Sequence, residues 1–368
     1  MRYLLPLFLL LGALSVAGAD DWPMDGKTPS HAPVSADSIA PPLTLAWTFA
    51  TAEPITAAPV VKDGVLYVGG YDGNFYALDA LSGKEVWRYH PDSELFFWAP
   101  AAVAKGMVVF GGIDGIVYAR DAKTGKNLWK FGAYGVIAGG ITISGDRVYV
   151  SAMDNVLYAL SLKSGVEQWR HTAQWYYLTA PAVDTEHGML FTCAGDGQGC
   201  ALATKDGHPI WRKPVSVLAG CPQNGPFCLA GDRLYLAVSP GHLRCLKAAT
   251  GEVLWTAETG AGLSGCAVTD QQVIVGTRDG LSAFQLATGA PLWSFKDAAP
   301  VSRCTPAIAG KTVYFCSRNG RVYALDTTTG ARRWDYATGG PIDGSPALAN
   351  GRLYVTSCDG KVYSFQPK

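Results

Sequence analysis

The sequence has little charge and no excess of either sign. Charged residues make up 16% of its 368 residues, and 30 Lys and Arg balance 30 Asp and Glu. A chain without net charge has no overall field that attracts nucleic acid or an anionic membrane surface, so we expect no nucleic-acid partner. Catalytic signatures are also missing. The sequence has no phosphate-binding loop, nucleophile elbow or paired-carboxylate motif, and its 6 histidines are scattered.

Long apolar runs are absent except at the N-terminus, which reads MRYLLPLFLLLGALSVAGAD. Arg2, the apolar run from Leu4 to about Leu14 and the small residues before Asp20 are typical of a secretory signal peptide. The run is too short to cross a hydrocarbon core of about 30 Å comfortably, so we expect no membrane span. We predict cleavage near Ala19, removal of residues 1–19, and a periplasmic or secreted protein. The alternative is a buried N-terminal helix. No cysteine follows the cleavage site, so a bacterial lipid anchor is not indicated.

Glycine is abundant, with 43 residues, and many of them belong to a repeat. Eight segments align on a turn that is most often Asp-Gly or Asn-Gly: YDGNFYAL (71–78), IDGIVYAR (113–120), MDNVLYAL (153–160), GDGQGCAL (195–202), SPGHLRCL (239–246), RDGLSAF (278–284), RNGRVYAL (318–325) and CDGKVYSF (358–365). The first seven lead to tryptophans spaced 38 to 44 residues apart: Trp87, Trp129, Trp169, Trp211, Trp255, Trp293 and Trp334. A unit of this length, repeated eight times, indicates a repeat architecture.

Each unit reads as four short strands separated by turns that carry glycine. Four antiparallel strands per unit predict a β-propeller, because one such sheet cannot bury both of its faces alone. Trp47 lies 40 residues before Trp87, so strand 43–49 is an outermost strand without inner partners, whereas 345–365 supplies three inner strands without an outer one. We predict an all-β, eight-bladed propeller over 43–368, closed by strand 43–49 completing the C-terminal blade.

The segment 20–42 before the predicted ring is irregular and rich in Pro, Ser and Ala. It lacks a clear hydrophobic period, so we expect it to lie along the surface of the propeller or to be partly mobile. Trp22 is its candidate anchor.

The unit AAPVVKDGVLYVGGYDGNFYALDALSGKEVW (57–87) resembles the pyrroloquinoline quinone (PQQ) repeat, and the resemblance covers about residues 43–365. The PQQ-repeat family includes periplasmic quinoprotein dehydrogenases, which bind PQQ and calcium, and cofactor-free scaffolds such as the propeller of outer-membrane barrel assembly. The resemblance therefore implies the fold and leaves the function open. In this fold we expect the eight tryptophans to pack between blades, each with its N–H bonded to a neighbouring blade.

Binding residues in a propeller usually lie where the connections into the innermost strands converge on the mouth of the channel. Two connections are unusually aromatic, ELFFWAP (94–100) and AQWYYLTAP (173–181). Trp98 and Trp175, with their aromatic neighbours, could wall the mouth for a small planar ligand or for the apolar anchor of a partner protein. The alternative is that these rings plug the channel or cap blades.

Bound PQQ would require convergent cations for its three carboxylates, and oxygen ligands for calcium. Arg303 and Asp343 precede adjacent inner strands and could meet there, although a surface ion pair explains them equally well. The chain also lacks an adjacent Cys-Cys pair and a haem motif. We therefore expect an exported scaffold without a cofactor that binds an envelope protein and is not an enzyme. The alternatives are a small PQQ- and calcium-dependent oxidoreductase and a propeller that binds carbohydrate or another small ligand.

Cysteine is absent from the first half of the chain, since all 9 cysteines lie at or after Cys193. An exported chain meets oxidising conditions, so disulfides are their natural use. We predict bridges across hairpins between Cys193 and Cys200 and between Cys304 and Cys316, and a loop closed by Cys221 and Cys228. The odd remainder leaves at least one free thiol. No CxxC spacing is present, so we expect no metal cluster.

Overall fold

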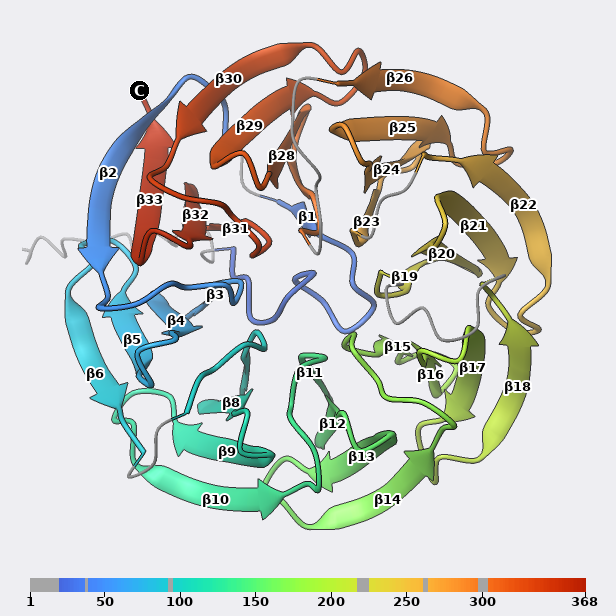
Figure 1. Cartoon of the computed structure of the whole chain (residues 1–368), viewed down its shortest axis with the longest axis horizontal. Helices are drawn as coiled ribbons and strands as arrows, with labels where there is room; N and C mark the ends of the chain where they lie inside the picture. The colour runs from blue at the N-terminus through green and yellow to red at the C-terminus, as the bar shows by residue number, and fades with distance from the viewer. Residues whose placement is uncertain (1–19, 37–38, 92–94, 217–224, 261–263, 297–303) are drawn as a thin grey trace, which may run out of the picture.

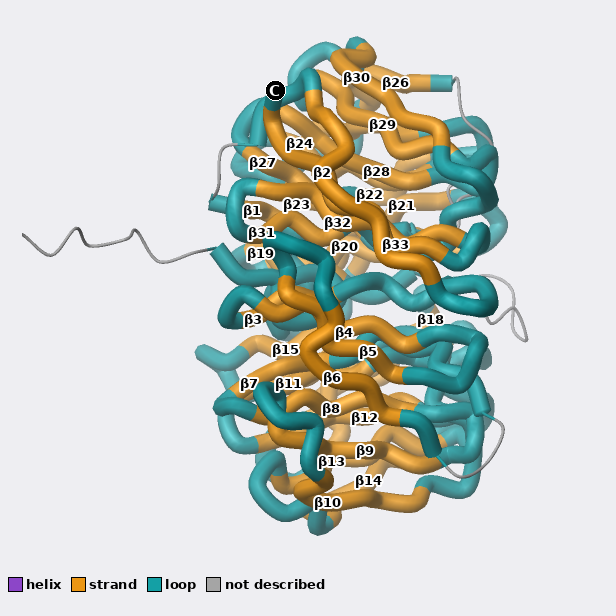
Figure 2. Tube along the Cα trace, turned by 90° about the vertical axis from the view of Figure 1, so that its left-hand side faces the viewer, coloured by secondary structure: helices purple, strands orange, loops and turns teal. Residues whose placement is uncertain are grey.

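The computed structural model describes residues 20–36, 39–91, 95–216, 225–260, 264–296 and 304–368, and these residues form strands, turns and loops without a helix. Eight sheets stand around a central channel like the blades of a propeller (Figure 1). Seen edge-on, the strands run across the thickness of the ring, and loops and turns cover its two faces (Figure 2). The predicted eight-bladed all-β propeller is confirmed. In the part of the chain described here, no helix is long and apolar enough to cross a membrane.

Each blade is an antiparallel sheet that runs from an inner strand at the channel to an outer strand at the rim. The strands of blades 1 to 4, from inner to outer, are β3 (Val60–Lys62), β4 (Val65–Gly69), β5 (Phe75–Asp79) and β6 (Glu85–Tyr89); β7 (Ala102–Ala104), β8 (Met107–Gly111), β9 (Ile116–Asp121) and β10 (Asn127–Gly132); β11 (Ile141–Ser144), β12 (Arg147–Ser151), β13 (Val156–Ser161) and β14 (Glu167–Thr172); β15 (Ala182–Asp184), β16 (Met189–Cys193), β17 (Gln198–Ala203) and β18 (Pro209–Pro214). Those of blades 5 to 8 are β19 (Cys228–Ala230), β20 (Arg233–Val238), β21 (His242–Lys247) and β22 (Val253–Glu258); β23 (Cys266–Val268), β24 (Gln272–Gly276), β25 (Leu281–Gln285) and β26 (Pro291–Phe295); β27 (Ala307–Ala309), β28 (Thr312–Cys316), β29 (Arg321–Asp326) and β30 (Arg332–Ala337); β31 (Ala347–Ala349), β32 (Arg352–Ser357), β33 (Lys361–Pro367) and β2 (Leu43–Ala50).

Blade 8 is assembled from both ends of the chain. Strand β2, near the N-terminus, pairs antiparallel with β33 from Leu43 opposite Pro367 to Ala50 opposite Lys361 (Figure 1). Its register shifts just before Trp47, as the register of β10 shifts just before Trp129. Because β2 carries the same irregularity as the outer strand of another blade, it is a true outer strand, and the predicted closure of the ring is confirmed.

The eight tryptophans join neighbouring blades. The indole N–H of each donates to a backbone carbonyl of the next blade or its closing strand over 2.8 to 3.3 Å. Trp334 of blade 7 donates to Leu43 of β2, so the closing strand also receives this link. A glycine lies under seven of these rings, and Gly125 under Trp87 is one example. The predicted role of the tryptophans is confirmed.

Gly125→Ala is expected to destabilise the ring more than Gly106→Ala, although both glycines belong to blade 2. The two share a left-handed backbone, with φ of +68° and +73°, in which alanine costs about 1 to 2 kcal/mol. A Cβ on Gly125 would lie 2.7 Å from Cδ2 of Trp87, whereas one on Gly106 would meet nothing within 4 Å. The clash adds roughly 1 to 3 kcal/mol at Gly125 alone. Denaturation midpoints measure the difference, and equal shifts would contradict this packing.

The segment 20–36 takes a different path from the predicted one. It crosses the middle of the ring, where Figure 1 shows it in blue, instead of lying along the outside. Trp22 is 1% exposed and its backbone forms a bridge with Val61 of β3. The end of the segment adds a short strand, β1 (Val34–Ser35), which pairs in parallel with β27. We call residues 20–36 the strap.

Candidate binding surface at the channel mouth

A loop leads from each blade into the inner strand of the next. In several blades this loop accepts a backbone hydrogen bond from the tight turn between the two middle strands of the blade that it enters. Ile113 donates its N–H to Phe96, Met153 to Val136 and Gly195 to Tyr176. Each such loop and turn therefore lie together at one end of a blade and form the mouth of the channel.

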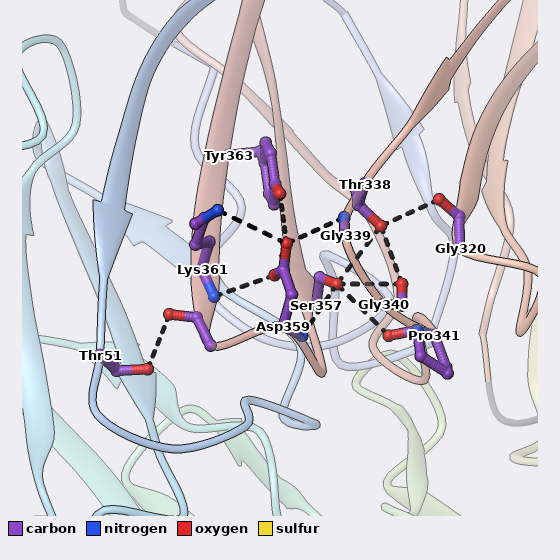
Figure 3. A network of polar contacts seen from close by, with 11 residues as sticks. Thr51, Gly320, Thr338, Gly339, Gly340, Pro341, Ser357, Asp359, Lys361 and Tyr363 are labelled. Carbon is purple, nitrogen blue, oxygen red and sulfur yellow. Dashed lines mark hydrogen bonds and ion pairs between the residues drawn. The ribbon is translucent and has the colours of Figure 1, made fainter.

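The aspartate of the repeated turn holds these loops in place. Asp359 accepts hydrogen bonds from the hydroxyl of Tyr363, from its own turn at Lys361 and from the N–H of Gly339 in the mouth loop (Figure 3). Asp154 repeats the pattern in blade 3, where its carboxylate accepts from Tyr158 and from the N–H of Tyr134. The mouth loops are thus held by charged hydrogen bonds, which are stronger than neutral ones.

These contacts also perturb the tyrosines of the repeat. Burial raises the pKa of the Tyr158 hydroxyl, and its hydrogen bond to the Asp154 carboxylate raises that pKa further. The pKa of the Tyr363 hydroxyl is raised in the same way. Burial is the larger cause, and the hydrogen bond to the Asp359 carboxylate is the second. These hydroxyls stay protonated at neutral pH and serve as donors, so we assign the turn aspartates and tyrosines to the framework.

The first aromatic loop presents Trp98 to solvent, with 38% of the residue exposed. Its ring centroid lies 6.4 Å from that of Tyr71 in the turn of blade 1, and Phe96 stacks on Tyr71 at 5.2 Å. Phe97, between Phe96 and Trp98, is instead fully buried and packs on Phe110 of β8. The expectation that all three aromatic residues wall the mouth is therefore wrong for Phe97.

The second aromatic loop is built in the same way. Trp175 is 42% exposed and lies over Gly195, where an added Cβ would fall 2.3 Å from its Cδ1. Tyr176 lies beside it with ring centroids 5.6 Å apart, whereas Tyr177 is buried and its hydroxyl is 2.9 Å from Nδ1 of His171. In both loops the sequence identified the aromatic cluster, and packing decided which rings face solvent.

Two exposed residues that the sequence did not single out lie between these loops. Tyr134, in the loop entering blade 3, is 89% exposed, and Met153 in the turn of the same blade is also exposed. The sequence does contain a sign that Tyr134 is exposed, because this large ring stands between the small residues Ala133 and Gly135 in a mouth loop. Together with the rings of the two loops, these residues lie at the mouth end of four consecutive blades, and we call the set the aromatic arc: Tyr71, Phe96, Trp98, Tyr134, Met153, Trp175 and Tyr176.

Only one of the two charged candidates for a cofactor site, Asp343, lies among the described residues. Arg303 lies outside the described residues, and the partner of Asp343 is Arg318, whose Nε is 3.1 Å from Oδ1 of the carboxylate. In the described part of the chain, no group of three or more His, Cys, Asp and Glu side chains is arranged to hold a metal ion. Among the described residues, Asp343 is therefore already paired with a cation from the turn of blade 7.

The cysteines differ from the predicted bridges. Cys193 lies opposite Gly199, and Cys200 lies opposite Thr192, so the register of the hairpin is one residue away from a direct cross-strand pair. Cys200 is a thiol, and burial raises its pKa to about 11. The predicted bridge between them is thus absent from the structure.

The second predicted pair lies close together but unbridged. The N–H of Cys316 is 3.3 Å from Sγ of Cys304, and both residues are buried thiols. Burial raises the pKa of the Cys316 thiol, and the neighbouring Cys304 raises it further. Cys228 is also a buried thiol, and Cys221, its predicted partner, lies outside the described residues.

The strap carries two titratable side chains into the ring, a buried His31 and a partly buried Asp25. Burial lowers the pKa of His31 to about 4, and its Nε2 lies 3.3 Å from the carbonyl of Pro181. Burial raises the pKa of Asp25, although hydrogen bonds from Ser345 and from its neighbour Gly26 oppose that shift. Nδ1 of His31 and Oδ1 of Asp25 are buried without a hydrogen-bond partner.

Acid is expected to destabilise the protein through His31. Between pH 6.5 and about 4 the unfolded chain binds a proton at this imidazole and the folded protein does not, so the free energy of unfolding falls as the pH falls. The loss between pH 7 and pH 4.5 is roughly 2 kcal/mol. His31→Gln, which does not titrate, should lose less stability over this range. The raised pKa of Asp25 changes the stability in the opposite direction as the pH falls. This contribution is the same in the wild type and the variant, so it cancels when the two are compared. Denaturation midpoints at the two pH values measure the effect, and parallel losses would contradict a buried neutral His31.

The ring and its repeat define a class of protein, the eight-bladed propellers of PQQ-type repeats. In this chain the strap also pairs with the inner strands. A family model described as outer membrane protein assembly factor BamB matches residues 44–133, 113–220, 218–300 and 277–368. These matches extend from the closing strand β2 to the last residue of the chain. The chain therefore belongs to the BamB family.

Individual relatives agree with this assignment. The outer membrane protein assembly factor BamB of Burkholderia pseudomallei is 28% identical over 325 residues, which cover 84% of each chain. The crystal structure of BamB from Moraxella catarrhalis matches with a TM-score of 0.76 at 22% identity, over 88% of this chain and 99% of that one. The quinohemoprotein alcohol dehydrogenase of Comamonas testosteroni matches with a TM-score of 0.80 at 16% identity, over 95% of this chain and 82% of that one. The two structural matches show the shared propeller fold.

Proposed function

We propose that this chain is an exported scaffold of outer-membrane protein assembly that binds another envelope protein through its aromatic arc. Membership of the BamB family is the observation that carries the proposal. The arc supports it, because Trp98 and Trp175 are large exposed rings on loops that the repeat holds in place. Aromatic anchors on a prearranged surface bind without a large cost in ordering the scaffold.

The strap inside the ring favours a protein partner over a small ligand. Small-molecule sites are usually concave and enclose most of the ligand. Here the strap lies against the inner strands behind the mouth, and the exposed rings are spread over the loops that enter three blades. A surface of this kind fits the apolar side chains of a second protein.

Export is part of the same proposal. We expect the mature protein to begin at Asp20 in the periplasm or outside the cell. The carboxylate of Asp20 binds Lys27 and Ser35 within the strap, so the expected mature N-terminus is held inside the ring. The intact mass of the protein purified from the envelope fraction tests the cleavage site, and a retained apolar N-terminus would contradict it.

Disruption of the chromosomal copy tests the function itself. We expect lower levels of β-barrel proteins in the outer membrane, restored by the wild-type chain and less well by a Trp98→Ala/Trp175→Ala chain that accumulates to the same level. Unchanged levels of these proteins in the disrupted strain would overturn the proposal.

The oxidoreductase alternative has its own test. The dehydrogenase match supports the fold alone, and Asp343 is paired with Arg318. Titration with PQQ and calcium, followed by tryptophan fluorescence and dye-coupled oxidation of alcohols and sugars, is expected to show neither saturable binding nor turnover. Calcium-dependent saturation with turnover would instead make the protein a quinoprotein.

A further inference from the structure

The strap binds to the inside of the ring through backbone hydrogen bonds. N–H groups from six blades donate to its carbonyls over 2.7 to 3.2 Å: Val61 to Trp22, Val103 to Pro23, Val183 to Pro29, Leu229 to Ser30, Ile308 to Pro33 and Asn350 to Asp20. Five of these donors sit at the centre of an inner strand, and Asn350 follows β31. The inner strands thus surround the strap with hydrogen-bond donors that point into the channel.

The composition of the strap suits this environment. An inner strand has no neighbour on its channel side, so its inward N–H groups need acceptors. Three of the six accepting carbonyls belong to Pro23, Pro29 and Pro33. Proline supplies a carbonyl and has no N–H that would need a partner inside the channel. The prolines that suggested an irregular surface segment are therefore suited to binding in the channel.

Side chains anchor the strap at several points around the ring. Trp22 belongs to the apolar core that includes blades 7, 8 and 1, and Met24 packs into the core of blades 2 and 3. His31 reaches the carbonyl of Pro181 just before β15. These contacts give the strap a defined position in addition to its backbone hydrogen bonds.

The two ends of the strap are joined to each other. The carboxylate of Asp20 accepts hydrogen bonds from the Oγ of Ser35 at 2.5 Å and the N–H of Ala36 at 2.8 Å, and it forms an ion pair with Lys27. The strap is therefore a closed loop whose contacts with the ring are noncovalent.

We propose that the inner strands form a binding site for an extended, proline-containing peptide, and that residues 20–36 are its ligand, bound in cis. The site recognises peptide carbonyls through converging N–H donors and recognises the ligand through a pocket for Trp22. While the strap is bound, the channel is closed. A strap freed from its covalent link should stay bound to the ring and exchange slowly with a separate peptide of the same sequence.

The experiment uses the full mature chain with a site-specific protease sequence inserted after Ala36. After cleavage the 17 residues from 20 to 36 are held only by noncovalent contacts. We expect them to co-elute with the ring in gel filtration and to exchange with a labelled synthetic peptide of the same sequence. Because such a ligand stabilises by mass action, the melting temperature of the cleaved protein should rise as peptide is added.

Variant peptides test the specificity of the site. Trp22→Ala removes the buried anchor and is expected to weaken binding to the cleaved ring at least tenfold, whereas Val34→Ala, at an exposed position of β1, should change it less than twofold. Three results would overturn the proposal: a ring that unfolds once it is cut, a melting temperature that does not respond to peptide, or equal binding of the two variants.

Discussion

A chain that begins at residue 52, without β2 and the strap, is expected to lose the cooperative thermal transition of the full protein and to aggregate. Strand β2 pairs with β33 along its length, and Trp47 donates to Ala80 in blade 1. Without β2, the edge of β33 is unpaired and can pair with another chain. Thermal melts followed by circular dichroism, together with sedimentation, measure the loss.

A circular permutant separates the closure of the ring from the strap. The two chain segments run side by side at the end of blade 8, where Lys368 donates its N–H to Pro42 over 3.2 Å. Residues 52–368 followed by a short turn and then by 43–51 should therefore restore the outer strand. The permutant also lacks the strap, so recovery of a cooperative transition isolates the contribution of β2. A truncated chain that melts cooperatively at the temperature of the full protein would contradict the role of β2.

Trp98→Ala/Trp175→Ala is expected to abolish most binding of the envelope partner while leaving the ring folded. Aromatic hot spots contribute 2 kcal/mol or more each, so the loss of two should weaken binding by roughly a thousandfold. Both side chains are partly exposed, so the melting temperature should change little. Binding is measured by titration with the partner purified from cross-linked envelopes.

Leu292→Ala provides the matched control for the aromatic arc. Leu292 is an exposed apolar residue on the outer strand β26, at the rim of the ring and far along the chain from the arc. Its loss should leave partner binding unchanged. If it weakens binding as much as the tryptophan pair does, the partner binds the rim and the arc is not the site.

The fold followed from the sequence because its information is local and repeated. Each unit carries its own turns and alternating strands, so the same prediction could be made eight times and the copies agreed. The closure could also be predicted, because Trp47 has the spacing of an outer strand without inner partners. The aromatic loops at the mouth could be predicted as well. The register of the repeat shows which residues belong to the connections between blades, and two of these connections are rich in aromatic residues.

The errors concern contacts between segments that are distant in sequence or that depend on single-residue register. The predicted bridge between Cys193 and Cys200 requires the two residues to lie directly opposite each other. Their register differs from that by one residue, which turns the two side chains to opposite faces of the sheet. Phe97 and Trp98 are neighbours in sequence, yet one is in the core and the other faces solvent. Asp343 met Arg318 from the turn of blade 7, a residue that the sequence offered no reason to choose.

Sequence alone was sufficient for the number of blades, the closing strand and the tryptophan links, because each depends on a pattern that recurs within about 40 residues. The path of the strap depended on the assembled ring. The backbone carbonyls of the strap accept hydrogen bonds from N–H groups of six blades. These N–H groups come together only when the ring has formed. A proline-rich segment looks irregular when it is read alone, because the hydrogen bonds that order it come from residues as far along the chain as Asn350.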